Sequence, residues 1–596
     1  MSQTAARPPR ESALRDFTTD LRVLVLTGMA LAVGTMGAGA AWALLRLIAL
    51  FTNIAYFGRL SVTMPAIADT PLGLFAIAVP VAGSLIVGLM ARFGSEKIRG
   101  HGIPEAIEAI LIGNSRIEPK IAVLKPLSSA ISIGTGGPFG AEGPIIMTGG
   151  ALGSLFAQLF RMSSVERKTL LVAGAAAGMT AVFGTPIAAI LLAVELLLFE
   201  WKPRSFIPVA AAAVVAAAWR PWLLGAGPLF PYTGDPAIPW WGLALCASAG
   251  LVAGLQSALT TISLYGIEDL FRRLPIHWMW WPAIGGVAVG IGGYLDPSVL
   301  GVGYDSIRAL LHGSLGTHDA AWLLLDKAAI WVIALSSGTS GGVLAPLLIM
   351  GGALGALAAP LLPFGDPGFW ALLGMAAMLG GTMRAPLTAT AFALELTGNI
   401  HVLLPLLVAS VCAFAVTVLL MDRSILTERI ARRGLHLSRE YTVDPFDVMR
   451  VADIMASPVD SLSATIAVAE AVAFFSAAEG KRRHKSYPVV NAENRVVGIV
   501  SRSDVLRWTR DGWKEGETLA SRTENVSLVL GYPDEIVGHL ADRMAAAEVG
   551  RVPIVSRGTG ALVGLVARRD LLHVRSRTVR EEQERSQSLR FFQNAT

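Results

Sequence analysis

The 596-residue chain has few charged residues and almost no cysteine. Charged residues make up 16% of the chain and hydrophobic residues 53%, with a mean hydropathy of +0.57. Because soluble domains average about 25% charged residues, this composition indicates a polytopic protein embedded in a lipid bilayer. Two cysteines, Cys246 and Cys412, cannot form a disulfide framework, and their apolar neighbours in the sequence predict small buried hydrophobes.

Several functional classes lack their sequence signals. The net charge of +5 is modest and no dense basic stripe is present, so we expect no nucleic-acid partner. A membrane zinc protease needs a His-Glu-x-x-His motif, which none of the nine histidines supplies. A magnesium transporter needs clustered acids along its ion path, whereas the glycine-rich part of this membrane domain has a lone acid. We therefore expect no enzyme active site and no metal site.

The N-terminal segment 1–21 is polar and carries Arg7, Arg10 and Arg15. It lacks a short apolar core followed by a small-residue cleavage site, so no cleaved signal peptide is predicted. Arginines before a first span favour the cytoplasmic side of the membrane. We expect a multi-pass protein of the cell membrane with both termini in the cytoplasm.

Long apolar runs alternate with short, interrupted ones. The runs 23–51 and 72–91 are long enough to cross a bilayer. Three following segments, which begin at Gly100, Lys125 and Gly143, are too short to span singly. Backbone at membrane depth must have its polar groups satisfied inside the protein, so we expect these pieces to be broken helices around a buried site. Further apolar runs lie at about 206–224, 241–264, 280–295 and 402–421.

The membrane part contains an internal repeat. Residues 142–155 align without gaps on residues 344–357, so that Pro144 falls on Pro346. A second pair of segments, 173–200 and 373–398, follows in the same order. Repeats of this kind are typical of transporters and channels built from two related halves. The first copy carries Glu142 where the second carries Leu344, and this asymmetry predicts the functional centre.

Glu142 is the candidate gate. A carboxylate in the membrane core costs roughly 3 kcal/mol or more unless it is paired or neutralised, so its presence predicts a function. It stands immediately before Gly143-Pro144, and proline is favourable at the first position of a helix. A helix start attracts anions, so the carboxylate can occupy an anion's place and be displaced by one. The alternative is a fixed helix cap. Similar starts at Gly102-Ile-Pro104 and before Pro346 predict that three helix dipoles converge.

Four motifs resemble those of the CLC family of chloride channels and proton/chloride antiporters. They are Gly100-His-Gly-Ile-Pro104, Gly140-Ala-Glu-Gly-Pro144, Gly342-Val-Leu-Ala-Pro346 and Arg423-Ser-Ile-Leu-Thr-Glu428. The resemblance implies an all-α polytopic membrane domain with an inverted repeat of broken helices, followed by an α/β pair of CBS domains. The implied boundaries are a membrane domain at 22–433 with repeats at about 70–220 and 280–421, a linker at 434–450, CBS units at 451–510 and 518–575, and a disordered tail at 576–596.

The resemblance also implies site residues. Glu142 is the gating glutamate, and Lys125 adds positive potential near the path; its alternative role is a lysine that extends to the membrane interface. The implied anion-binding residues are His101, Gly102, Ile103, Gly143, Val343, Leu344 and Leu426. The anion is expected to be chloride or a similar small ion, and the family implies a homodimer with one pathway in each subunit.

Some positions depart from the family pattern. His101 replaces the pore serine and Leu426 the pore tyrosine, so two hydroxyl donors are missing and anion selectivity is open. An imidazole at His101 can donate a hydrogen bond instead, or merely fill space. Leu196 stands where antiporters usually carry an internal acid, which favours a gated chloride channel; a proton-coupled antiporter is the alternative. Glu195 is a candidate for the proton path, although its repeat twin Glu395 indicates a shared structural role.

The C-terminal part predicts two similar β-hairpin and helix units, with hairpins at 486–500 and 551–566. A serine three residues before an aspartate resembles the nucleotide signature of CBS domains, as in Ser501 and Asp504. Asp570 also fits, but Ala567 stands in place of the hydroxyl residue. No cofactor is expected to be required, and an adenine nucleotide at the CBS pair is an open alternative to a purely structural contact.

Overall fold

A computed structural model describes residues 21–111, 113–434, 446, 449–476, 484–523 and 528–574. The chain divides into two units, Met1–Arg439 and Glu440–Thr596, each of which is considered by itself. The expectations for the N-terminal segment before residue 21, for most of the linker and for the tail after residue 575 lie outside the described residues.

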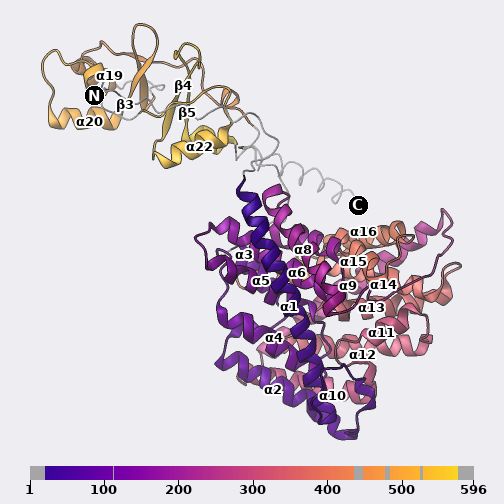
Figure 1. The fold of residues 1–596 in the computed structure, drawn as a ribbon. Coiled ribbons are helices and arrows are strands. Elements are labelled where there is room, and N and C mark those ends of the chain that lie inside the picture. Colours follow the sequence, from indigo (N-terminus) through magenta and orange to yellow (C-terminus); the bar gives the residue numbers. More distant parts are fainter. Residues whose placement is uncertain are drawn as a thin grey trace. The chain divides into compact units, whose positions relative to one another are not determined.

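The first unit is helical, as the sequence predicts (Figure 1). Short 3-10 turns and one π-helical turn, Ala193–Leu198, connect some of its helices. The helices are α1 (Arg22–Phe57), α2 (Ala78–Phe93), α3 (Ile103–Leu111), α4 (Pro119–Gly134), α5 (Glu142–Gln158), α6 (Ser164–Phe183), α7 (Pro186–Leu192), α8 (Pro203–Leu223), α9 (Gly242–Arg272), α10 (Trp281–Leu295), α11 (Tyr304–Leu311), α12 (Thr317–Ser336), α13 (Leu344–Ala358), α14 (Pro367–Met383), α15 (Pro386–Thr397), α16 (Leu403–Leu420) and α17 (Ile425–Ala431).

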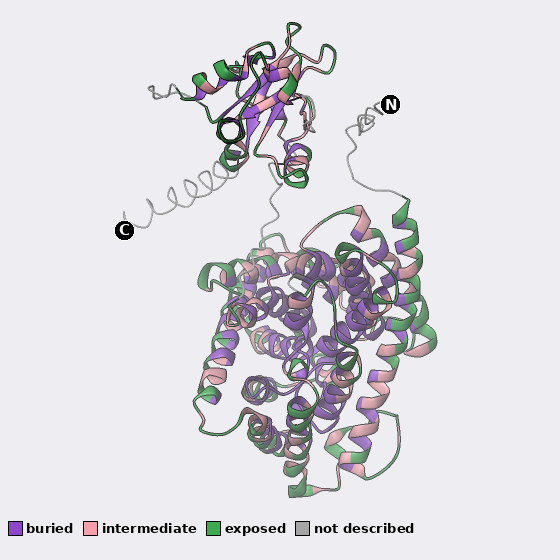
Figure 2. Ribbon diagram, turned by 90° about the vertical axis from the view of Figure 1, so that its left-hand side faces the viewer, coloured by how far each residue is buried: buried purple, intermediate pink, exposed green. Residues whose placement is uncertain are grey.

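Burial separates the outer helices of this unit from the inner ones. The apolar windows of α1, α2, α8, α9 and α16 are long enough to cross a membrane but only 33–39% buried. The window beginning with α13 is 61% buried, and α5, α6 and α14 are buried along most of their length. Figure 2 shows the same pattern, with buried helices inside and exposed faces at the periphery. Apolar surface on the outer helices is left uncovered by the described residues and suits contact with lipid.

Glycine pairs let the inner helices of each repeat approach closely. A Cβ added to Gly149 in α5 would lie 2.9 Å from the carbonyl carbon of Gly174 in α6. In the second repeat, a Cβ added to Gly351 in α13 would lie 2.8 Å from the carbonyl carbon of Gly374 in α14. Small residues replace a hydrophobic driving force in membranes by allowing close backbone packing.

The two repeats cap each other's helices. The backbone N–H and hydroxyl of Thr388 donate to Glu195 at 2.9 and 2.5 Å, at the start of α15. The backbone N–H groups of Ile187 and Ala188 donate to Glu395 at 2.9 and 2.8 Å, at the start of α7. Each glutamate therefore satisfies the free amides at the start of a helix in the opposite repeat. This geometry supports the shared structural role for Glu195.

The second unit contains two small β-hairpins that share the same local features. Residues 495 and 561 form a bridge between them, and both hairpins have a register shift near the end of their first strand. The strands β2 and β3 are antiparallel, as are β4 and β5, and β1 is parallel to β2. The elements are β1 (Leu462–Ser463), α19 (Val468–Ser476), β2 (Ser486–Val490), β3 (Val496–Ser501), α20 (Arg502–Asp511), α21 (Leu519–Thr523), α22 (Val537–Ala546), β4 (Arg551–Val555) and β5 (Leu562–Ala567).

The reciprocal caps generate a stability prediction. Replacing Glu195 or Glu395 with alanine removes hydrogen bonds to helix-start amides, and each change is expected to destabilise the protein by about 0.5–2 kcal/mol. Glu195→Gln keeps an acceptor oxygen and should lose less. Thermal unfolding of the purified protein in detergent measures both effects. If Glu195→Ala unfolded at the wild-type temperature, the capping role would be wrong.

Candidate functional site

Loop backbones hold the starts of three broken helices together. Gly100 donates its N–H to Thr339 O at 3.0 Å and pairs with Ser340, which ties the segment before α3 to the segment before α13. Gly342 donates to Gly140 O at 2.9 Å, which ties the segment before α13 to that before α5. A Cβ on Gly102 would lie 2.8 Å from Gly143 O, so glycine is needed where α3 and α5 meet. The predicted convergence of the three helix starts is present.

The prolines lie one or two residues later in these helices than the sequence predicts. Pro104 is the second residue of α3, and Pro144 and Pro346 are the third residues of α5 and α13. The expectation that Pro144 opens its helix is therefore wrong. The difference costs no hydrogen bond, because the first four N–H groups of a helix have no partner within the helix.

The Glu142 carboxylate lies at the start of the opposite repeat's helix. Its Oε1 accepts a hydrogen bond from the N–H of Ala345 at 2.9 Å, and the side chain is fully buried. Its Oε2 has no hydrogen-bond partner among the described residues. A buried oxygen without a partner is costly, so Oε2 is the less satisfied of the two carboxylate oxygens. The donor is one residue beyond Val343 and Leu344, which stay the predicted amides for an anion.

Lys125 is buried within the same set of loops. Its Nζ donates to Ile98 O at 2.8 Å, to Gly100 O at 2.7 Å and to the Ser340 hydroxyl at 3.1 Å. The side chain has no exposed surface, so the alternative of a lysine extending to the interface is wrong. Lys125 fixes the loop that begins α3 against the loop that begins α13 and places a cation beside both.

The second repeat contains an equivalent lysine that we did not predict. Lys327 is seventeen residues before Leu344, as Lys125 is before Glu142, and this spacing was available in the sequence. Lys327 is fully buried and its Nζ donates to Val299 O at 2.7 Å and to Gly301 O at 3.4 Å. It fixes the loop before α11, the counterpart of α3. The Tyr304 hydroxyl at the start of α11 is buried without a partner among the described residues.

The two residues that depart from the family pattern are both buried. His101 precedes α3, and its Nδ1 has no hydrogen-bond partner in the described part of the chain. Leu426 is fully buried in α17, next to Ile425, whose carbonyl accepts a 2.5 Å hydrogen bond from Tyr265. Helix α17 packs near the start of α3, where Arg429 contacts Glu105 at 3.3 Å.

The position expected for an internal acid is apolar in its environment as well as its identity. Leu196 is fully buried in the π-helical turn, and the neighbouring Glu195 is occupied as a helix cap. The Glu195 carboxylate therefore has a structural role as a helix cap. Carrying a proton would require it to give up these hydrogen bonds.

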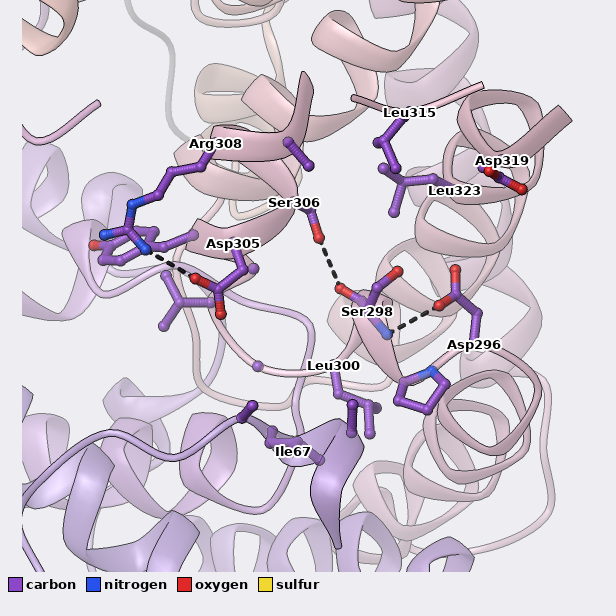
Figure 3. Close-up of a pocket in the computed structure, with 18 of the residues that line it drawn as sticks. Ile67, Asp296, Ser298, Leu300, Asp305, Ser306, Arg308, Leu315, Asp319 and Leu323 are labelled. Atoms are coloured by element: carbon purple, nitrogen blue, oxygen red, sulfur yellow. Dashed lines mark hydrogen bonds and ion pairs between the residues drawn. The ribbon is translucent and has the colours of Figure 1, made fainter. Parts of the chain in front are cut away.

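A cavity of about 820 Å³ lies at the end of the membrane unit where α1 and α10 finish. Figure 3 shows Arg308 directed at Asp305, with an ion pair of 2.8 Å, and Asp296 and Asp319 around the same space. The three aspartates outnumber the one arginine in its lining. The cavity is therefore unlike a pocket that holds an anion.

In the second unit, the predicted nucleotide residues bond to one another. The Ser501 hydroxyl donates to Asp504 Oδ2 at 2.5 Å, and Asp504 N–H donates back to Ser501 Oγ at 3.3 Å, which caps α20. Asp570 accepts the N–H of Ala567 at 2.7 Å. Ser501 and Asp504 cap the start of α20, and Asp570 does the same for the helical residues that begin at 568. Helix capping is a sufficient structural reason for their presence.

Comparison with known proteins gives the family of the chain. The model of the family described as "Voltage gated chloride channel" matches residues 82–418, and the CBS domain model matches residues 451–511 and 531–577. These matches include the three helix starts of the membrane unit and the two hairpin modules.

Individual relatives agree with this result. A putative chloride channel protein ClcB-like from Ralstonia nicotianae is 30% identical over 57% of this chain and 81% of its own length. An H(+)/Cl(−) exchange transporter ClcA from Klebsiella pneumoniae is 31% identical over 54% of this chain and 70% of its own length. The solved structure of a slow cyanobacterial Cl−/H+ antiporter has the same fold, with a TM-score of 0.61, 23% identity, and coverage of 70% of this chain and 99% of that one. The chain therefore belongs to the CLC family of anion transporters and carries a C-terminal pair of CBS domains.

Proposed function

We propose that this protein exchanges chloride, or a similar small anion, for protons across the membrane, with Glu142 taking part in both movements. The observation that supports this most directly is the buried Glu142 carboxylate on the Ala345 amide. That amide belongs to a helix start, where the partial positive charge favours an anion. The carboxylate therefore occupies a place suited to a transported anion.

The gate works by competition between two negative groups. An incoming anion and the Glu142 carboxylate cannot both occupy the start of α13, because like charges in a low-dielectric site repel strongly. Protonation of Glu142 removes its charge, weakens its hydrogen bond to Ala345 and lets the side chain leave. The partnerless Oε2 is the oxygen available to take that proton. Each time the protonated side chain leaves the start of α13, an anion can enter, so uptake of a proton is coupled to binding of an anion.

The relatives favour exchange over the passive channel that Leu196 predicts. The Klebsiella relative is named an H(+)/Cl(−) exchange transporter, and others of that name come from Salmonella strains. A chloride channel stays the second candidate, because Leu196 cannot carry a proton and Glu195 caps a helix. Anion selectivity also stays a proposal, since His101 and Leu426 replace the family's hydroxyl residues.

Reconstituted vesicles separate the two candidates. With exchange, the reversal potential for chloride is expected to shift when a pH gradient is applied, whereas a channel would give the Nernst potential of chloride alone. Glu142→Ala should retain anion flux and lose its pH dependence, because the competing and titrating group is gone. Loss of all anion flux in a folded Glu142→Ala protein would overturn the gate. Magnesium flux serves as the negative control for ion class.

Adenine-nucleotide binding by the CBS pair is a further proposal, as is a homodimer. If a nucleotide binds through Ser501 and Asp504, it must replace the hydrogen bonds that join them. Asp504→Ala is then expected to weaken ATP binding to the full-length protein by about tenfold, as measured by calorimetry, whereas Asp570→Ala beside Ala567 should weaken it less. Equal ATP affinity in the wild type and both variants would assign these residues to helix capping alone.

A further inference from the structure

A second, smaller cavity lies at the opposite end of the membrane unit from the aspartate-lined one. Its volume is about 270 Å³, and it is bounded by the ends of α9 and α12, the start of α10, the loop before α3, and α17. Arginines dominate its lining, and Glu268 is its one acidic residue. The cavity-lining arginines are Arg99, Arg272, Arg429, Arg432 and Arg433.

All but one of these arginines are paired with acids. Arg272 contacts Glu268 at 2.6 Å, and Arg432 is bonded to both oxygens of Asp269 at 2.5 and 3.0 Å. The paired set is completed by Arg429 with Glu105 and by Arg433 with Glu105 and Glu108. These acids neutralise the positive charge of four of the cavity-lining arginines. The net positive charge of the cavity therefore comes from the fifth.

Arg99 is that fifth arginine. In the described part of the chain it has no ion pair and its side chain makes no hydrogen bond, and its buried Nε lacks a partner. The guanidinium lies over Trp278, 4.4 Å from the ring centroid, and 5.9 Å from the centroid of Trp281. The rings hold the planar cation in one orientation, but they accept no N–H hydrogen bond of normal strength. A guanidinium held this way has its N–H donors available to an outside group.

The aromatic residues also give the depth of the cavity in the membrane. Trp278, Trp280 and Trp281 lie at the start of α10, and Trp280 is 46% exposed. Tryptophans concentrate at the boundary between the hydrocarbon core and water, which is the level of lipid phosphates. A basic pocket between membrane helices at this level suits a phosphorylated head group.

We propose that this cavity binds a phosphate group, with Arg99 as its principal donor. The planar fork of a guanidinium matches two phosphate oxygens, whereas a halide offers a single acceptor. The cavity volume is also far larger than one halide requires and can hold a phosphate with part of its ester group. The phosphate belongs to an anionic lipid head group or to free phosphate in solution, and the experiment distinguishes these two sources.

The test uses the full-length purified protein in two arms. Native mass spectrometry counts phosphatidic acid retained by each variant, with phosphatidylcholine as the reference lipid. Thermal unfolding of delipidated protein, with inorganic phosphate added, measures binding of the free ion. The variants are Arg99→Gln, Arg99→Lys and Trp278→Leu. The matched control is Arg92→Gln, because Arg92 is an exposed arginine at the end of α2 that does not line the cavity.

We expect wild type and Arg92→Gln to retain phosphatidic acid, and Arg99→Gln to retain about tenfold less. Arg99→Lys should fall between them, because lysine keeps the charge without the fork. Trp278→Leu keeps the Arg99 side chain but removes the ring that orients it, so this variant should also retain less lipid. It replaces Arg99→Gln in the test if Arg99→Gln does not fold. An effect confined to the inorganic-phosphate arm supports the site and assigns it to free phosphate. Wild-type behaviour of Arg99→Gln and Trp278→Leu in both arms would overturn the proposal.

Discussion

The structure depends on positive helix ends that meet inside an apolar protein and need a negative partner there. The loops before α3, α5 and α13 are hydrogen-bonded to one another, so the three helix starts cannot separate independently. Glu142 supplies the negative charge from within the chain by accepting the Ala345 N–H. Oε2 of the same carboxylate has no hydrogen-bond partner among the described residues. In the proposed function, an anion takes the place of this carboxylate at the helix start.

The internal repeat explains how such a site is supported. Lys125 and Lys327 each hold the carbonyls of the loop before a short helix, and Glu195 and Glu395 each cap a helix of the opposite half. These pairs use one physical solution twice, because the two halves present the same unsatisfied backbone groups. The two halves differ at the helix start itself, where Leu344 takes the place of Glu142. In the proposed function, only the first half therefore provides a side chain that competes with the anion.

The capping role of Glu195 also changes how the proton path must be considered. A carboxylate that accepts two hydrogen bonds from Thr388 is stabilised where it is, and its neighbour Leu196 is apolar and buried. The residues of the π-helical turn therefore secure the contact between repeats. Coupling of protons to anions, if the protein exchanges them, must then reach Glu142 by a route that does not use this turn.

The sequence by itself determined the membrane class, the repeat and the CBS hairpins, and it made Glu142 the candidate gate, because hydropathy, glycine-proline spacing and an isolated acid are local signals. The spacing also contained Lys327, which a comparison of the two halves would have found. Only the tertiary structure decided that Glu142 bonds to Ala345, that Glu195 caps the opposite repeat, and that Arg99 lies over tryptophan with no ion pair among the described residues. Each of these contacts joins segments far apart in the chain. A single sequence does not show which distant groups will meet, because folding alone brings them together.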